Sequence, residues 1–555
     1  MMRSVHAFAS SARRAALVLA LPVAWLVPSC IATLVPTLVP TLGAQGGVAP
    51  GERSTPVADA TVDVGVNARI RTEGIAHSQV LATARMLSEG FGPRLSGAPG
   101  YTAAAKWAVR ELTRSGATRA TLEPWGTRGP AWDLTAHSAV MTSPFDLRLN
   151  ALPKAWSLPI AGTLRGAPVL VPSLSKPAER AQWAGKLRGR IVMLGRVNET
   201  VDIAERFVAA AVRHTDAELD SMARISEPGS PKDYWEDFDD WDASLRDRRT
   251  RLEWMMSEGV AAVMEASGNE LTIRATQYNS AVSPRDVNVP AFVVAREQYR
   301  RLQFLIDRGA PVTLELSLAT RVDAADTVGV NVVAEIEGSD PVLKDEVVMM
   351  GGHFDSWHAA GGATDNAAGS AVAMEALRIL VAIDARPRRT IRLALWDGEE
   401  QEDYLGSAGY VRRHFGDHAT MRLKPEHSRI SAYFNVDHGT GRIRGWYLQG
   451  NAAARPILAA YLAPWSDLGA TVLNIQNRGS TDHLAFTGVG IPGFNSIQDE
   501  MDYESRTHHT ALDGAGFLVE DDLKQASMVL ASMVYHVANR DGLMPRTALP
   551  APRKP

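Results

Sequence analysis

Cysteine is almost absent from this chain of 555 residues, which contains only Cys30. One thiol cannot form an internal disulfide framework or a thiolate metal site, so stability must come from the core and from other ligands. An excess of positive charge is also absent, because 58 Lys and Arg stand against 62 Asp and Glu, for a net charge of −4. We therefore expect no nucleic-acid partner.

Two catalytic patterns are missing as well. The sequence has no His-Glu-x-x-His segment, which disfavours a single-zinc endopeptidase, and no Gly-x-Ser-x-Gly elbow, which argues against a serine hydrolase. The hydrophobic share of 45% is ordinary for a globular protein. Because one core rarely supports 555 residues, two or three structural units are expected.

The N-terminus has the features of a targeting segment, and residues 1–44 are predicted to be a signal peptide. Three arginines precede its apolar stretch, and small residues follow it. The stretch is long enough to span a membrane, but four prolines within it disfavour a stable helix. We expect an exported protein, periplasmic or extracellular, without a stable membrane span in the mature chain. The alternatives are lipid attachment at Cys30 and an uncleaved N-terminal anchor.

Changes in composition divide the rest of the chain. A polar, glycine- and proline-bearing linker is followed by helical patterns, then by short β-like runs, and finally by alternating strands and helices. A charged helical stretch at about 200–257 interrupts the β-like part, and its acidic-aromatic run 233–242 is interpreted as a solvated helix face, with calcium or substrate binding as the alternative. The expected units are a linker at 45–70, an N-terminal part of the main domain at 71–149, a β-rich domain at 150–322, a catalytic domain at 323–545 and a tail at 546–555.

The alternation from about residue 327 onward predicts an α/β fold with a mostly parallel sheet and helices on both faces. Ligands of such sheets gather at the carboxyl ends of the strands. Polar motifs stand at these ends here. The expected strands 346–350, 390–396 and 430–436 lead to His353, to Glu399 and Glu400, and to Asp437.

Five short segments of the last third carry the chemistry. They are Gly-Gly-His353-Phe-Asp355, Gly-Ala-Thr-Asp365-Asn366, Trp-Asp-Gly-Glu399-Glu400, Asn-Val-Asp437 and Thr-His508-His509. Imidazole nitrogen and carboxylate oxygen are zinc ligands, a carboxylate can bridge two ions, and a further free carboxylate can take the proton from water. Singly, each segment has a structural explanation, such as a helix cap or an acidic turn. Together and in this order they predict a hydrolase with two zinc ions.

These segments, with Gly-Pro-Arg94-Leu-Ser-Gly upstream and Gly479-Ser-Thr-Asp482 downstream, resemble the di-zinc aminopeptidase and carboxypeptidase family of exopeptidases. Within it, the branch that contains carboxypeptidase Q is the most similar, over roughly residues 75–545. The resemblance implies the zinc-exopeptidase fold, an α/β fold with a mixed, mostly parallel sheet flanked by helices. It also implies that the β-rich part is an inserted protease-associated domain, and that the protein forms a homodimer.

The resemblance implies a role for each site residue. One zinc ion would be held by His353, Asp365 and Asp437, and the other by Asp365, Glu400 and His509, with Asp365 as the bridge. Glu399 would be the general base, Asp355 would orient an imidazole as a second-shell carboxylate, and His508 would stabilise the oxyanion or contact substrate.

The expected function is that of an exported zinc exopeptidase acting on dipeptides or on terminal residues of short peptides, through a zinc-bridged hydroxide with Glu399 as base. Three alternatives stay open at this point. The same site could serve an aminopeptidase on longer peptides, or the hydrolysis of another small amide such as an N-acyl amino acid. The third alternative is a catalytically silent, receptor-like binding protein.

Overall fold

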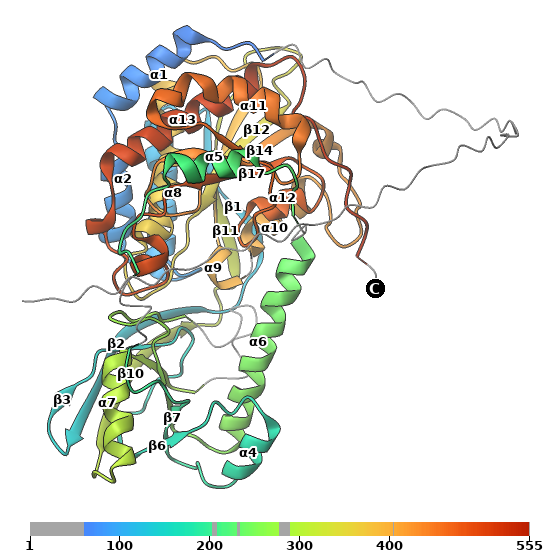
Figure 1. Cartoon of the computed structure of the whole chain (residues 1–555). Helices are drawn as coiled ribbons and strands as arrows, with labels where there is room; N and C mark the ends of the chain where they lie inside the picture. Colours follow the sequence, from blue (N-terminus) through green and yellow to red (C-terminus); the bar gives the residue numbers. More distant parts are fainter. Residues whose placement is uncertain (1–59, 202–207, 230–233, 277–288, 403, 554–555) are drawn as a thin grey trace, which may run out of the picture. The chain divides into compact units, whose positions relative to one another are not determined.

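The structure is a computed structural model, which describes residues 60–201, 208–229, 234–276, 289–402 and 404–553 (Figure 1). The predicted signal peptide with Cys30, most of the expected linker and Asp233 lie outside the described residues. Three sheets are found within the described ranges, with eight, four and five strands.

The largest sheet confirms the predicted α/β fold with a mixed, mostly parallel sheet. Its strands are β1 Arg119–Thr127, β11 Val328–Ile336, β12 Val347–His353, β13 Thr390–Trp396, β14 Ile430–Asn435, β15 Ile443–Tyr447, β16 Val472–Asn474 and β17 Gly493–Gln498. They lie in the order β1-β11-β13-β12-β14-β17-β15-β16. The central strands β13, β12, β14 and β17 run parallel, and antiparallel pairings occur toward both edges.

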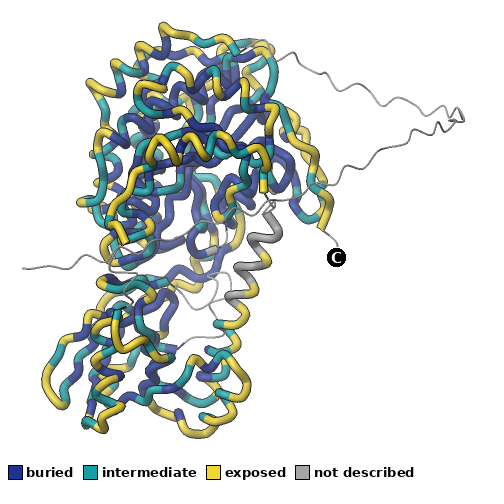
Figure 2. Tube along the Cα trace, in the orientation of Figure 1, coloured by how far each residue is buried: buried dark blue, intermediate teal, exposed yellow. Residues whose placement is uncertain are grey.

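Helices cover both faces of this sheet. They are α1 Val64–Ala76, α2 Val80–Arg85, α3 Pro99–Arg114, α8 Ala368–Ala382, α9 Glu399–Glu402, α10 Leu405–His414, α11 Arg455–Leu462, α12 His483–Thr487 and α13 Glu520–Asn539. Along β12, Val348 and Met350 join the core shared with α8 and α13, whereas Val347 and Met349 join the core shared with α10 and α12. Both faces are therefore buried, which explains why the central strands read as continuous apolar runs (Figure 2).

The two smaller sheets are formed by the chain between β1 and β11. One has the order β3-β2-β10-β5 and the other β4-β9-β8-β7-β6, in which β6 to β9 are parallel. Their bounds are β2 Ala131–Ser143, β3 Leu147–Arg148, β4 Ala151–Pro153, β5 Leu164–Gly166, β6 Pro168–Val171, β7 Ile191–Leu194, β8 Ala262–Ala266, β9 Ala291–Val294 and β10 Thr313–Asp323. Four helices accompany them in sequence: α4 Pro177–Trp183, α5 Asp216–Arg224, α6 Tyr234–Ser257 and α7 Arg296–Asp307.

One helix spans an expected unit limit, and two further elements contact sheets other than those of their expected units. Helix α1 begins inside the expected linker, because Asp63 caps its first turn and Val66 and Ile70 pack into the main core. Strand β2 lies before the expected limit at 149, in the part of the chain assigned to the main domain. It nevertheless pairs with β10 of a smaller sheet and not with the large sheet. Helix α5 lies in the expected charged insertion, yet its Leu219 packs against β16 and β17 of the large sheet. Within the described ranges, none of the helices combines the length and apolar character needed to cross a membrane.

Candidate metal centre

His353 and Asp437 come from neighbouring parallel strands. His353 is the last residue of β12, and Asp437 follows the end of β14 by two residues. The glycines before His353 permit this arrangement, since a Cβ on Gly351 would lie 1.8 Å from the carbonyl oxygen of Ala394. The His353 Nε2 lies 3.1 Å from Asp437 Oδ1, and both side chains are almost fully buried.

Asp365 lies on the turn that leads into α8. Sequence reasoning left open whether Asp365 caps this helix, and the structure assigns the capping hydrogen bond to its neighbour: Asn366 Oδ1 accepts from the Gly369 N–H at 2.8 Å. The Asp365 backbone N–H donates to Asp513 Oδ2, and Thr364 donates twice to Asp513 Oδ1. The Asp365 carboxylate is thereby left to face the centre of the site.

Glu399 and Glu400 begin α9, directly after β13. Their backbone N–H groups donate to the two oxygens of Asp355, at 3.2 and 3.1 Å. Asp355 was expected to orient His353 through its carboxylate. The nearer acceptor of His353 Nδ1 is instead the backbone carbonyl of Asp355 at 3.0 Å, with the carboxylate at 3.5 Å. Asp355 therefore links β12 to the glutamate pair.

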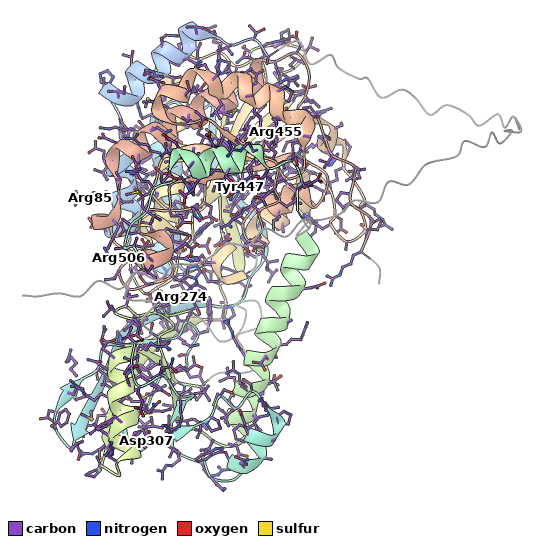
Figure 3. The ribbon with its side chains drawn as sticks, in the orientation of Figure 1. Arg85, Arg274, Asp307, Tyr447, Arg455 and Arg506 are labelled. Carbon is purple, nitrogen blue, oxygen red and sulfur yellow. The ribbon has the colours of Figure 1, made fainter. Side chains whose placement is uncertain are left out.

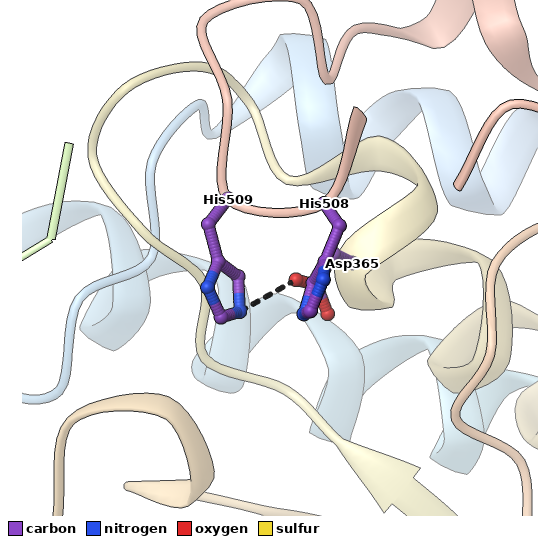
Figure 4. Close-up of side chains that lie close together, drawn as sticks. All are labelled: Asp365, His508 and His509. Carbon is purple, nitrogen blue, oxygen red and sulfur yellow. Dashed lines mark ion pairs between the residues drawn. The ribbon is translucent and has the colours of Figure 1, made fainter. Parts of the chain in front are cut away.

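His508 and His509 follow a single turn of helix at Tyr503–Thr507. His509 has a left-handed backbone with φ 61°, a conformation that non-glycine residues seldom adopt outside functional sites. Its Nε2 lies 2.7 Å from Glu400 Oε2. The same nitrogen lies 3.2 Å from Asp365 Oδ2, the pairing that Figure 4 shows. The His508 ring lies against the rings of Tyr503 and His509, with centroids 4.7 and 3.9 Å apart.

The side chains form two clusters that share Asp365. One Asp365 oxygen lies 3.3 Å from His353, which also contacts Asp437, and the other lies 3.2 Å from His509, which also contacts Glu400. His353, Asp365 and Glu400 form one group with metal-ligand spacing, and Asp365, His508 and His509 form another. The geometry thus brings together all five predicted ligands and adds His508 to their neighbourhood.

The charges of these clusters are unbalanced, which fits a site for cations. At Asp365 burial favours the neutral carboxyl, but His353 and His509 outweigh it and hold the pKa well below its usual range. Burial raises the pKa of Glu400 well above its usual range, and Asp365 adds to this effect. Asp365 Oδ2 and Glu400 Oε1 are buried without a hydrogen-bond partner among the described residues. Buried carboxylate oxygens of this kind are costly unless a cation accompanies them, and the imidazole and carboxylate donors suit zinc.

A cavity of ≈ 800 Å³ opens onto these side chains. Glu399 lines it, and burial raises the pKa of this carboxyl group well above its usual range, with His353 opposing the shift. Arg274, from the chain between β8 and β9, also lines the cavity and places Nη2 3.2 Å from His509 Nδ1 (Figure 3). The Arg274 backbone forms a β-bridge with Thr510, which fixes this approach.

Sequence reasoning missed the groups that brace the site. Asp513 holds the Asp365 turn, as described above, and the Tyr503 hydroxyl donates to Asp365 Oδ1 at 3.1 Å. Arg94 is fully buried and donates to the carbonyl oxygens of Phe354, Gly361 and Gly362, so it ties together the loop after His353. The motif containing Arg94 was noticed, but a single sequence does not reveal which backbone groups such a side chain reaches.

Comparison with known proteins places this part of the chain beside one peptidase family. Residues 331–534, which carry every predicted ligand, match the model of peptidase family M28. These residues resemble an M28 peptidase domain. Carboxypeptidase Q of Rattus norvegicus is 26% identical over 466 residues, which cover 83% of this chain and 86% of the rat protein. The predicted resemblance to the carboxypeptidase Q branch and the predicted metallopeptidase class are confirmed.

Two solved structures share the fold of this chain. The Peptidase M28 precursor from Shewanella amazonensis SB2B has a TM-score of 0.63 and 22% identity, covering 88% of this chain and 98% of its own. The zinc aminopeptidase from Bacillus subtilis has a TM-score of 0.54 and 18% identity, covering 82% of this chain and 94% of its own. The chain therefore has the fold of M28 peptidases over most of its length.

Proposed function

We propose that this M28 peptidase is a two-zinc exopeptidase that hydrolyses dipeptides or the terminal residues of short peptides. The observation that carries the proposal is the Asp365 carboxylate, whose two oxygens face two separate histidine–carboxylate pairs at 3.3 and 3.2 Å. His353, Asp365 and Asp437 would hold one ion, and Asp365, Glu400 and His509 the other. When bound, the two ions would polarise the substrate carbonyl and lower the pKa of the attacking water.

Glu399 is the proposed general base. It lines the cavity beside both clusters, and its backbone is held by Asp355. Its carboxylate takes the proton from the attacking water and passes it to the leaving amine. His508 contributes a ring nitrogen near Asp365 and His509, from which it donates to the oxygen that becomes negative in the transition state. Asp355 positions the glutamate pair by accepting from the backbone N–H groups of Glu399 and Glu400.

The direct test is hydrolysis of a matched peptide panel: a free dipeptide, its N-acetylated form, its C-amidated form and a pentapeptide. Each is assayed as purified, with chelator, and after zinc is restored. Zinc-restorable cleavage that requires both free termini supports a dipeptidase related to carboxypeptidase Q. Cleavage that tolerates the C-terminal amide and the longer chain assigns an aminopeptidase instead. No zinc-restorable cleavage of any peptide would contradict the proposal.

Substitution of the base separates its role from metal binding. We expect Glu399→Gln to lower kcat by about 10²–10⁴-fold while zinc content is unchanged, because the amide cannot accept the proton. Glu426→Gln is the matched control, since Glu426 is exposed and contacts only His414. Loss of zinc together with activity in Glu399→Gln would show that Glu399 is a ligand.

Three further parts of the proposal concern the whole chain. Export is inferred from the predicted signal peptide at 1–44, and fractionation of cells expressing the full chain tests it. A homodimer is inferred from the family resemblance, and light scattering of the purified protein tests it. The sheets between β1 and β11 are proposed to form a protease-associated domain. Arg274, which belongs to this part of the chain, lines the cavity of the site.

A further inference from the structure

A second cavity, of ≈ 420 Å³, lies wholly within the part of the chain that forms the two smaller sheets. This volume is within the range of small-molecule sites. Five cationic side chains and one carboxylate are among its lining residues. They are Lys154, Arg196, Arg248, Arg251 and Arg296, with Glu265. We call this cavity the cationic annex.

The annex lies where ligands of parallel sheets are usually found. Ser173, Arg196 and Ser267 follow the ends of the parallel strands β6, β7 and β8, and all three line the annex. Arg296 begins α7 directly after β9, which is parallel to β8. The carboxyl ends of neighbouring parallel strands form a crevice that commonly takes ligands. The position of the annex and its arginine-rich lining therefore both indicate a binding site for an anion.

The annex holds more positive than negative charge. Lys154 pairs with Glu265 at 2.6 Å, and this glutamate is the one acidic residue among the described lining residues. Three of the arginines pair with carboxylates outside the lining: Arg196 with Asp307 at the end of α7 (Figure 3), Arg251 with Asp247 and Arg296 with Glu270. The side chains of Lys154, Arg251 and Arg296 are only 10%, 18% and 23% exposed. A guanidinium that pairs with one carboxylate keeps further N–H donors, and such partly buried donors can bind an added anion.

The annex is continuous with the candidate active site. Arg248, Gly268 and Thr276 line both cavities. One ligand can therefore occupy both, with its reacting bond beside Glu399 and its anionic group in the annex. Guanidinium groups recognise carboxylates through paired, charge-assisted hydrogen bonds, and four of the five annex cations are arginines.

We propose that the cationic annex binds the side-chain carboxylate of an acidic peptide substrate, so that the enzyme prefers peptides that contain Glu or Asp. This inference rests on the proposed peptidase function and adds a substrate preference to it. The annex is distinct from the metal centre, because it shares none of the five predicted metal ligands.

The test uses two pairs of tripeptides with the zinc-loaded full-length enzyme. Ala-Ala-Glu is compared with Ala-Ala-Gln, and Glu-Ala-Ala with Gln-Ala-Ala. In at least one pair we expect the acidic peptide to have a kcat/KM about tenfold higher, through a lower KM, as one hydrogen bond to a charged group would give. Equal kcat/KM values within both pairs would overturn the proposal.

Two arginines on one helix supply the variant and its control. Each pairs with a carboxylate on the same helix, Arg251 with Asp247 and Arg249 with Glu253, but only Arg251 is among the lining residues of the annex. Arg251→Gln is expected to lower kcat/KM for the acidic peptide about tenfold and to change the neutral peptide by less than twofold. Arg249→Gln is expected to change neither. A similar loss on both peptides in Arg251→Gln, or equal effects of the two variants, would contradict a role in recognising charge.

Calorimetric titration with glutarate and with inorganic phosphate separates the annex from catalysis. We expect glutarate to bind and Arg251→Gln to weaken this binding about tenfold, with Arg249→Gln unchanged. If neither the tripeptides nor the free dipeptide of the panel above is cleaved, the peptidase proposal fails, and glutarate binding alone decides whether the annex takes carboxylates. Phosphate binding that Arg251→Gln weakens, with no preference for acidic peptides, would make the annex a site for free anions and overturn the substrate proposal.

Discussion

The two halves of the proposed metal centre are built differently. His353 and Asp437 lie at the ends of adjacent parallel strands, and their side chains are 1% and 8% exposed. His509 lies on a loop, is 19% exposed, and meets Glu400 on the short helix α9. The first half takes its geometry from the central sheet. The second takes its geometry from loops that other parts of the chain must hold.

The two halves also differ in the partner of the imidazole Nδ1 atom. His353 Nδ1 donates to the Asp355 carbonyl, which leaves Nε2 directed at Asp365 and Asp437 as a ligand requires. His509 Nδ1 faces Arg274 Nη2 at 3.2 Å, and a guanidinium can only donate. When His509 Nε2 holds a metal, Nδ1 carries the proton, so this contact opposes binding. The His353 half is therefore preorganised for an ion, and the His509 half is not.

The largest expected effect is that of the residue common to both halves. Asp365→Ala removes a ligand from each ion, so we expect zinc content to fall in both halves and activity to fall by at least about 10²-fold. Zinc content and kcat are measured together, with the surface variant Asp467→Asn as the control, because Asp467 contacts only Arg71 on the exterior. Retention of one full zinc equivalent by Asp365→Ala would argue against a shared carboxylate.

The second largest expected effect is a difference in zinc affinity between the two halves. A chelator titration of the wild-type enzyme should remove zinc in two steps, with the ion at His509 and Glu400 lost first. An affinity difference of about 10–100-fold is expected, the size that partners of a ligand imidazole contribute. His509→Ala should keep the more tightly held ion, whereas His353→Ala should lose it. Loss of both ions in a single step would mean that the halves are equivalent.

A smaller effect tests the role of Arg274. Arg274→Gln removes a cation 3.2 Å from His509 Nδ1, and we expect the weaker zinc ion to be retained several-fold more tightly. Arg165→Gln is the control, since Arg165 pairs with Glu315 on β10 and is 66% exposed. The readout is the free zinc concentration at half-saturation. Unchanged or weaker retention in Arg274→Gln would show that Arg274 does not oppose the ion.

The smallest effect concerns a histidine outside both halves. His418 donates to the Ala485 carbonyl, and burial lowers its pKa to about 4, below the ordinary 6.5. Between pH 6.5 and 4 the unfolded chain takes up a proton at this residue and the folded chain does not, so stability falls as the pH falls. Denaturant unfolding at pH 7 and pH 5 should show a weaker acid destabilisation in His418→Gln, by about 1–2 kcal/mol. An unchanged pH dependence would place the acid sensitivity elsewhere, for example in metal loss.

The same contrast explains what the sequence could predict. His353, Glu399, Glu400 and Asp437 follow apolar strands, and the carboxyl ends of parallel strands meet at one edge, so periodicity alone brings these residues together. The strands themselves were predictable because burial on both faces makes them continuously apolar. His509 and Asp365 lie on loops, and only the family resemblance assigned them.

The groups that the sequence could not predict act across long separations. Arg274 reaches His509 from 235 residues away, and Asp513 holds the Asp365 turn from 148 residues away. Such contacts depend on how loops pack, for which a single chain carries no periodic signal. The cationic annex was missed for the same reason, since its five cations are spread between Lys154 and Arg296.

Zinc-edge anomalous diffraction from crystals of the zinc-loaded enzyme tests the central claim most directly. The account predicts two peaks, one among His353, Asp365 and Asp437 and one among Asp365, Glu400 and His509, with Glu399 outside both coordination spheres. A single peak, or a peak coordinated by Glu399, would contradict it.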